Sequence, residues 1–202
     1  NGVPPEEAWT HFSNQLWEKR SLLLFVQRDW LRRWFPDYDP TVPDQVEDKN
    51  RPWDFDHIHP QRYLVSDSGS SRRKIPPIVW DWHQSIGNLR AWPLEANRSD
   101  GDTSPRIKLS TVGPAEQRYG ISDPSTKCAA SFVDFPGDEW DDDWCKSVPA
   151  KVESGERPLR YLAIPDDIGG PARQALIRAI TSRFPRLYRH WYEALRIGDL
   201  MP

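Results

Sequence analysis

Twenty prolines are spread along the 202 residues of this chain, and they limit how long a helix or strand can be. A proline lacks a backbone N–H and biases the residue before it away from helical geometry, so each proline predicts a boundary between elements. Prolines at positions 36, 40, 43 and 52 predict a loop over residues 36–52, and Pro60 is expected to end a short strand. The chain is therefore expected to fold as short elements that are joined by proline-rich connections.

Two segments keep the three- and four-residue spacing of apolar side chains that is typical of amphipathic helices. These are residues 6–35 and residues 171–196, the second with a bend expected at Pro185. Between them the sequence predicts strands and short helices: strands centred on 55–58 and over 88–92, and helices over 78–86 and 94–98. Residues 105–160 show no clear periodicity. We therefore expect an α+β fold in a single domain that spans residues 1–202.

The composition narrows the class of protein. Hydrophobic residues make up 37% of the chain and aromatic residues 12%, which is enough to bury a core and excludes a disordered chain. The longest apolar stretch, residues 22–26, is far shorter than the roughly 18 residues that span a bilayer, so no membrane partner is expected. Cys128 and Cys145 are too few for a disulfide framework, which favours a reducing, cytoplasmic location. The chain begins at Asn1 without a signal-peptide pattern, so we expect it to be part of a longer polypeptide.

The charged residues are unevenly distributed. The formal net charge is −3, but residues 134–143 hold six acids and no base, and the rest of the chain has 27 Lys and Arg against 24 acids. Arginine outnumbers lysine 20 to 7, and its guanidinium binds phosphate through two parallel hydrogen bonds. The net charge therefore does not exclude a nucleic-acid partner.

The segment Asp54-Phe55-Asp56-His57-Ile58-His59-Pro60-Gln61 holds the residues with the clearest chemical use. A carboxylate such as Asp56 binds hard divalent cations, and a neutral histidine such as His57 can take a proton from water. Asn97, on the helix predicted from residue 94, can add a neutral oxygen ligand. Together these side chains suit the hydrolysis of a phosphodiester.

This segment, together with Asn88-Leu89 and Asn97-Arg98, closely resembles the HNH, or ββα-metal, nucleases. The resemblance implies a ββα-metal core over residues 50–104, with an N-terminal helical brace over 1–36 and a C-terminal extension with a terminal helix over 105–202. It also implies that Asp56 and Asn97 hold Mg²⁺ or Mn²⁺, that His57 is the general base, and that Asn88 fixes the loop between the strands. The implied activity is metal-dependent cleavage or nicking of DNA.

Residues 22–28 and 34–39 extend the resemblance to the C-terminal half of GmrSD-like and SspE-like anti-phage restriction proteins. In such proteins an N-terminal nucleotide-hydrolysing domain senses foreign DNA, and the C-terminal HNH domain cuts it. The resemblance therefore implies phage or foreign DNA as substrate and a sensor domain of the same parent chain as partner. Two alternatives stay open: a non-catalytic DNA-binding or interaction module with a degenerate motif, and an RNA-targeting nuclease.

Several further side chains are candidates for the same site. Asp54 precedes Asp56 by two residues, so a strand directs both to one face, and Asp54 is a second candidate metal ligand. His59 shares the face of His57 and is expected either to contact phosphate or to fill space. Four basic residues are expected to contact DNA phosphates: Arg72, Arg73, Lys74 and Arg98.

The tryptophans and the C-terminal arginines have simpler interpretations. Most tryptophans have the spacing of core residues, and only Trp53 and Trp92, which flank the motif, are candidates for stacking on a nucleic-acid base. The arginines of the C-terminal helix, Arg183 among them, are expected to lie mostly on a solvated face.

Overall fold

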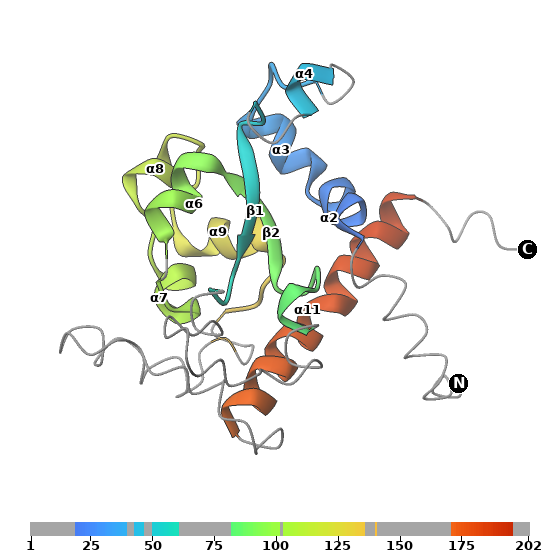
Figure 1. Cartoon of the computed structure of the whole chain (residues 1–202), viewed down its shortest axis with the longest axis vertical. Coiled ribbons are helices and arrows are strands. Elements are labelled where there is room, and N and C mark those ends of the chain that lie inside the picture. The colour runs from blue at the N-terminus through green and yellow to red at the C-terminus, as the bar shows by residue number, and fades with distance from the viewer. Residues whose placement is uncertain are drawn as a thin grey trace, which may run out of the picture.

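The computed structural model describes residues 19–39, 43–46, 50–60, 82–101, 103–135, 140 and 171–195. Its architecture is α+β, as expected, with one pair of strands among several short helices and a long one (Figure 1). In chain order the elements are α2 (Arg20–Val26), α3 (Arg28–Trp34), α4 (Pro43–Val46), β1 (Trp53–His57), β2 (Leu89–Pro93), α6 (Leu94–Asp100), α7 (Pro105–Ser110), α8 (Pro114–Gln117), α9 (Pro124–Ser131) and α11 (Pro171–Ala194).

The two strands run antiparallel at the centre of the molecule, with Asp56 opposite Arg90 and His57 opposite Leu89. Both strands overlap the segments predicted for them, and α6 begins at the residue directly after β2. Every residue of β2 is buried, whereas β1 keeps half-buried positions. Strand, strand and helix therefore follow one another in the order predicted for residues 50–104.

The helix predicted over residues 6–35 is confirmed over residues 20–34 of the described part, except that a turn at Gln27 divides it into α2 and α3. The Gln27 side chain is fully buried, its Oε1 accepts from the Ala91 N–H at 2.7 Å, and its Nε2 donates to the Ala130 carbonyl at 2.9 Å. Ala91 lies in β2, so the Gln27 amide satisfies backbone groups on the edge of β2 that β1 does not pair. The turn between α2 and α3 thus places the Gln27 amide beside the edge of β2, where buried backbone groups need hydrogen-bond partners.

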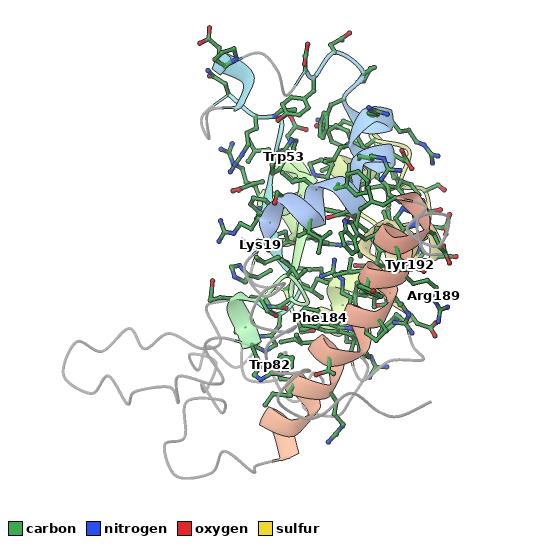
Figure 2. The ribbon with its side chains drawn as sticks, turned by 90° about the vertical axis from the view of Figure 1, so that its right-hand side faces the viewer. Lys19, Trp53, Trp82, Phe184, Arg189 and Tyr192 are labelled. Atoms are coloured by element: carbon green, nitrogen blue, oxygen red, sulfur yellow. The ribbon has the colours of Figure 1, made fainter. Side chains whose placement is uncertain are left out.

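The C-terminal helix predicted over residues 171–196 is confirmed as α11, which runs across the molecule beside α2 (Figure 1). Trp82 and Phe184 lie edge to face with ring centroids 6.1 Å apart, at the contact between α11 and the helical residues 82–84 (Figure 2). Leu176, Ile180 and Leu187 recur at helical spacing along α11, and all three are buried in the structure. Pro185 lies within this helix at an exposed position.

Arg183 is fully buried, which contradicts the solvated position expected for the arginines of this helix. Its guanidinium donates to the backbone carbonyls of Ile86, Gly87, Leu89 and Ser131. Burial, followed by the charge of Arg90, lowers the pKa of Arg183 to about 9, so it is still protonated at neutral pH. One buried cation thus joins α11 to the turn before β2 and to the end of α9.

Three short helices lie in residues 105–131, where the sequence showed no periodicity. Each begins with a proline at its first position, and the residue before that proline is Ser104, Gly113 or Asp123. Ser104 and Asp123 accept a hydrogen bond from a backbone N–H of the first turn, which is the usual N-cap interaction. These helices are too short for a period of apolar residues to reveal them. The sequence signal for them was instead a capping residue followed by proline.

Among the helices that the structure describes, none has both the length and the hydropathy that a bilayer crossing requires.

Candidate active site

His57 is the last residue of β1, and its half-buried ring lies against a second histidine. The rings of His57 and His83 are stacked, with centroids 4.8 Å apart and planes inclined by 16°. Gln84 follows His83 in the helical residues 82–84, which lie within the helix predicted over 78–86, and its Oε1 lies 3.2 Å from His57 Nε2. The end of β1 and the residues before β2 thus enclose His57 on two sides.

The hydrogen bonds of this cluster determine which nitrogen of His57 carries a proton. Burial, followed by the charge of His57, lowers the pKa of His83 to about 3, so His83 is neutral at pH 7. Its Nε2 lies 2.8 Å from the His59 carbonyl oxygen, which can only accept, so the His83 proton is on Nε2. His83 Nδ1 then accepts from Gln84 Nε2 at 3.0 Å, which turns Gln84 Oε1 toward His57. His57 must therefore donate from Nε2, and its Nδ1 keeps the lone pair.

The pKa of His57 is lowered, chiefly by burial, while the hydrogen bond to Gln84 and the charge of Asp56 act in the opposite direction. A lowered pKa keeps the imidazole neutral at pH 7. His57 is therefore an oriented, neutral proton acceptor that is still half exposed.

Asn88 is fully buried in the turn before β2 and holds this turn against the residues that follow β1. Its Oδ1 accepts from the His59 N–H at 2.8 Å, and its Nδ2 donates to the carbonyls of His59 at 3.2 Å and His83 at 2.9 Å. The Asn88 side chain thus joins the residues that follow β1 to the residues that precede β2.

Asp56 is almost fully buried, and both of its carboxylate oxygens already bind a cation. Oδ2 accepts from Arg90 Nε at 2.8 Å, and Oδ1 accepts from Lys108 Nζ at 2.8 Å. Burial alone would raise the pKa of Asp56, but the charges and hydrogen bonds of Lys108 and Arg90 lower it. Asp56 is therefore ionised and neutralised from within the protein.

The pair formed by Asp56 and Arg90 belongs to a longer chain of buried charges. Cations and anions alternate along it, each within 3.4 Å of the next: Lys108, Asp56, Arg90, Asp100, Lys127 and Glu116. The three positive and three negative groups cancel formally, which is the condition for keeping so many charges away from water. This chain of charges links β1 and β2 to α6, α7, α8 and α9.

The residues expected to hold a metal are not arranged as a vacant ligand set. Asp54 has a half-exposed carboxylate that binds Arg51 Nη2 at 3.1 Å, whereas Asp56 faces the interior. Asn97 is half-buried on α6. Within the part of the chain that the structure describes, no hydrogen bond joins the Asn97 side chain to Asp56 or to His57. The described residues contain no group of three or more His, Cys, Asp or Glu that could hold a metal ion. With Lys108 and Arg90 on the Asp56 oxygens, this arrangement does not fit a divalent cation.

The remaining candidates divide into buried and exposed residues. Trp53 and Trp92 are 3% and 0% exposed, so these two rings are core residues and cannot stack on a base. His59 is fully buried edge-on to His83, which excludes contact with a phosphate and favours the space-filling alternative. Arg98 is exposed on α6. Arg72, Arg73 and Lys74 lie outside the described residues.

Sequence reasoning missed four side chains that surround the candidate site. Gln84 and His83 orient His57, and Arg90 and Lys108 neutralise Asp56. The expected helix over 78–86 placed His83 and Gln84 close to Asn88 in sequence, which was a usable signal. Nothing in the sequence distinguished Lys108, which is 52 positions from Asp56, from a surface lysine.

Comparisons of the chain with protein-family models, with curated proteins and with solved structures found no match.

Proposed function

We propose that this chain is a nuclease domain of the HNH, or ββα-metal, type, in which His57 takes the proton of the attacking water. The observation that carries the proposal is the state of His57: a neutral, half-exposed imidazole at the end of β1, with its tautomer fixed by Gln84. The antiparallel pairing of β1 with β2 and the start of α6 directly after β2, together with the hydrogen bonds of Asn88, add support.

The proposed mechanism begins at His57 Nδ1, the nitrogen that carries the lone pair. This nitrogen accepts the proton of a water molecule as the water oxygen attacks phosphorus in line with the 3′-oxygen. The bond from phosphorus to the 3′-oxygen breaks as the new bond forms, and the departing 3′-oxygen takes a proton from solvent water. The hydrogen bond from Nε2 to Gln84 and the charge of Asp56 favour the positive charge that the ring gains, while the charges of Lys108 and Arg20 oppose it. Arg98, exposed on the helix that follows β2, is a candidate for binding the substrate phosphate.

The substrate that the resemblance favours is phage or foreign DNA, and the proposed partner is a nucleotide-hydrolysing sensor domain of the same parent chain. A cytoplasmic restriction system would supply both. A requirement for Mg²⁺ or Mn²⁺ stays a prediction of the resemblance, and no step above depends on a metal.

The test is cleavage of supercoiled plasmid by the full chain, with Mg²⁺, with Mn²⁺ and with EDTA. We expect nicking by the wild type, and His57→Ala should lose about 10²–10⁴-fold in rate, the usual contribution of a general base. His190→Ala is the matched control, because His190 is a half-buried histidine on α11 whose ring packs on Phe132, away from this cluster. Nicking by His57→Ala at the wild-type rate would refute the proposed base.

The same assay separates the alternatives. Parallel reactions with single-stranded RNA and with transfer RNA test the RNA-targeting nuclease. Absence of cleavage of any substrate under all three ionic conditions, with retained DNA binding, would favour the non-catalytic module.

A further inference from the structure

Lys108 occupies the place beside Asp56 where the resemblance implies a metal ion. Its ammonium lies 2.8 Å from Asp56 Oδ1 and 2.9 Å from the carbonyl oxygen of His57, and its side chain is fully buried. A carboxylate oxygen and a backbone carbonyl oxygen are the donors that hard divalent cations take in proteins. The ammonium is therefore held as a cation in a two-oxygen site, adjacent to the proposed base.

Arg90 is a second positive charge beside Asp56, and it repels any further cation at this site. Its Nε lies 2.8 Å from the other oxygen of Asp56, so one carboxylate already faces two cations. A divalent ion on Asp56 would be repelled by both, and little water is present to screen the repulsion at a carboxylate that is 4% exposed.

Of the two cations, Lys108 is the one whose removal disturbs fewer contacts at this site. Arg90 is held from several directions: it donates to Ser131 Oγ and Asp100, and its guanidinium carbon lies 3.7 Å from the centroid of the Trp92 ring. Lys108 stands on a short helix at the end of a flexible four-carbon side chain, and its contacts here are to Asp56 and to the His57 carbonyl. Departure of the Lys108 ammonium would uncover one carboxylate oxygen and the carbonyl together.

We propose that the Lys108 ammonium takes the place of the divalent cation that the resemblance implies beside Asp56, so that the site as it stands does not bind this ion. Lys108 thus excludes the metal from Asp56. The inference deepens the proposed function, because it concerns the same site, but it is tested by metal binding without any cleavage.

The experiment is titration of the full chain with Mn²⁺, with free Mn²⁺ followed by electron paramagnetic resonance. Lys108→Met removes the ammonium and should bind Mn²⁺ at least 10-fold more tightly than the wild type. Adding Asp56→Asn to this variant should abolish the gain, because the gain requires the carboxylate that Lys108 had covered. An unchanged affinity in Lys108→Met, or a gain that survives Asp56→Asn, would overturn the proposal.

Lys127→Met is the matched control. Lys127 is equally buried in the same chain of charges, but its ammonium binds Glu116 at 2.6 Å and not Asp56. Equal gains in the two variants would assign the effect to the lost positive charge of the network, and the proposal would be wrong. Near-ultraviolet circular dichroism checks that each variant is folded, and Lys108→Gln, whose amide can still donate to Asp56, replaces Lys108→Met if that variant is not.

The outcome is independent of whether the chain cuts nucleic acid. Tighter Mn²⁺ binding by Lys108→Met without cleavage of any substrate would support the role of Lys108 and refute the proposed function. Cleavage by the wild type with unchanged Mn²⁺ binding in Lys108→Met would do the reverse.

Discussion

At the scale of single residues, the proposed reactivity of His57 depends on an uncharged neighbour, Gln84. The Gln84 amide has one donor and one acceptor in use, and neutral His83 takes the donor, so only the acceptor is left for His57. A buried neutral histidine thus sets the orientation of an amide, and the amide sets the tautomer of the next histidine. An amide that bridges two imidazoles in this way can have only one orientation when the first imidazole cannot be charged.

Replacing Gln84 should change the pKa of His57 in a direction that depends on the replacement. The hydrogen bond to Gln84 raises the His57 pKa, so Gln84→Leu should lower it further and move the acidic limb of the pH–rate profile to lower pH. Gln84→Glu places a carboxylate at the same position and should move that limb to higher pH. Long-range ¹H–¹⁵N spectra of His57 report both its pKa and its tautomer without a substrate. Equal titration curves in the wild type and both variants would show that Gln84 does not position this ring.

At the scale of elements, the position of the turn before β2 is set by the helix α11. Arg183 of α11 binds the carbonyls of Ile86, Gly87 and Leu89, so one side chain of the helix holds two residues of this turn and the first residue of β2. The close approach also requires a residue without a side chain at position 87. A Cβ at Gly87 would lie 2.6 Å from Ile180 Cγ2 and 2.9 Å from the Ile180 carbonyl oxygen.

Gly87→Ala should therefore destabilise the protein by about 1–3 kcal/mol, the typical cost of overpacking a well-packed contact. The added methyl group would meet backbone as well as side-chain atoms of α11, so the helix must shift as a unit. Urea unfolding followed by tryptophan fluorescence measures the change in free energy of unfolding. Gly113→Ala is the matched control, since a Cβ there meets nothing within 4 Å, and its φ of −91° suits any residue. A loss in Gly87→Ala no greater than in Gly113→Ala would contradict the close packing of α11.

At the scale of the whole molecule, the interior holds titratable groups that respond to acid together. The pKa values of His57, His59 and His83 are all lowered, with burial the largest cause for each. In the unfolded chain these histidines have pKa values near about 6.5, so the unfolded state binds protons before the folded state does as the pH falls. Their contribution to stability is complete above about pH 6.5 and declines below it.

We therefore expect the free energy of unfolding to fall steadily as the pH drops from about 6.5, by up to about 1.4 kcal/mol per pH unit for each histidine that only the unfolded state protonates. For His83, whose pKa is about 3, the decline should continue down to that pH. His83→Phe keeps a ring stacked on His57 and should reduce the pH slope by about one proton between pH 6 and 4. Urea unfolding at several pH values measures the slope, and a slope unchanged by His83→Phe would be inconsistent with a buried neutral His83.

The order of elements and much of the candidate motif could be predicted from the sequence, because both depend on local patterns. Pro52 directly precedes β1 and Pro60 follows its end by three residues, and apolar spacing over many turns gave α11 its limits within two residues. The turn at Gln27 could not be predicted, because it is stabilised by Ala91, 64 positions away. The helices α7 to α9 were missed because elements of four to eight residues carry too few apolar positions for a period to appear.

By itself the sequence determined that the motif of Asp56 and His57 ends a strand and that a second strand and a helix follow the insertion. Only the tertiary structure decided what surrounds these side chains. Arg90 and Lys108 reach Asp56 from positions 34 and 52 residues away. Local periodicity records how each segment faces a core, but the pairing of buried charges depends on which segments meet, and that is set by the packing of the whole chain.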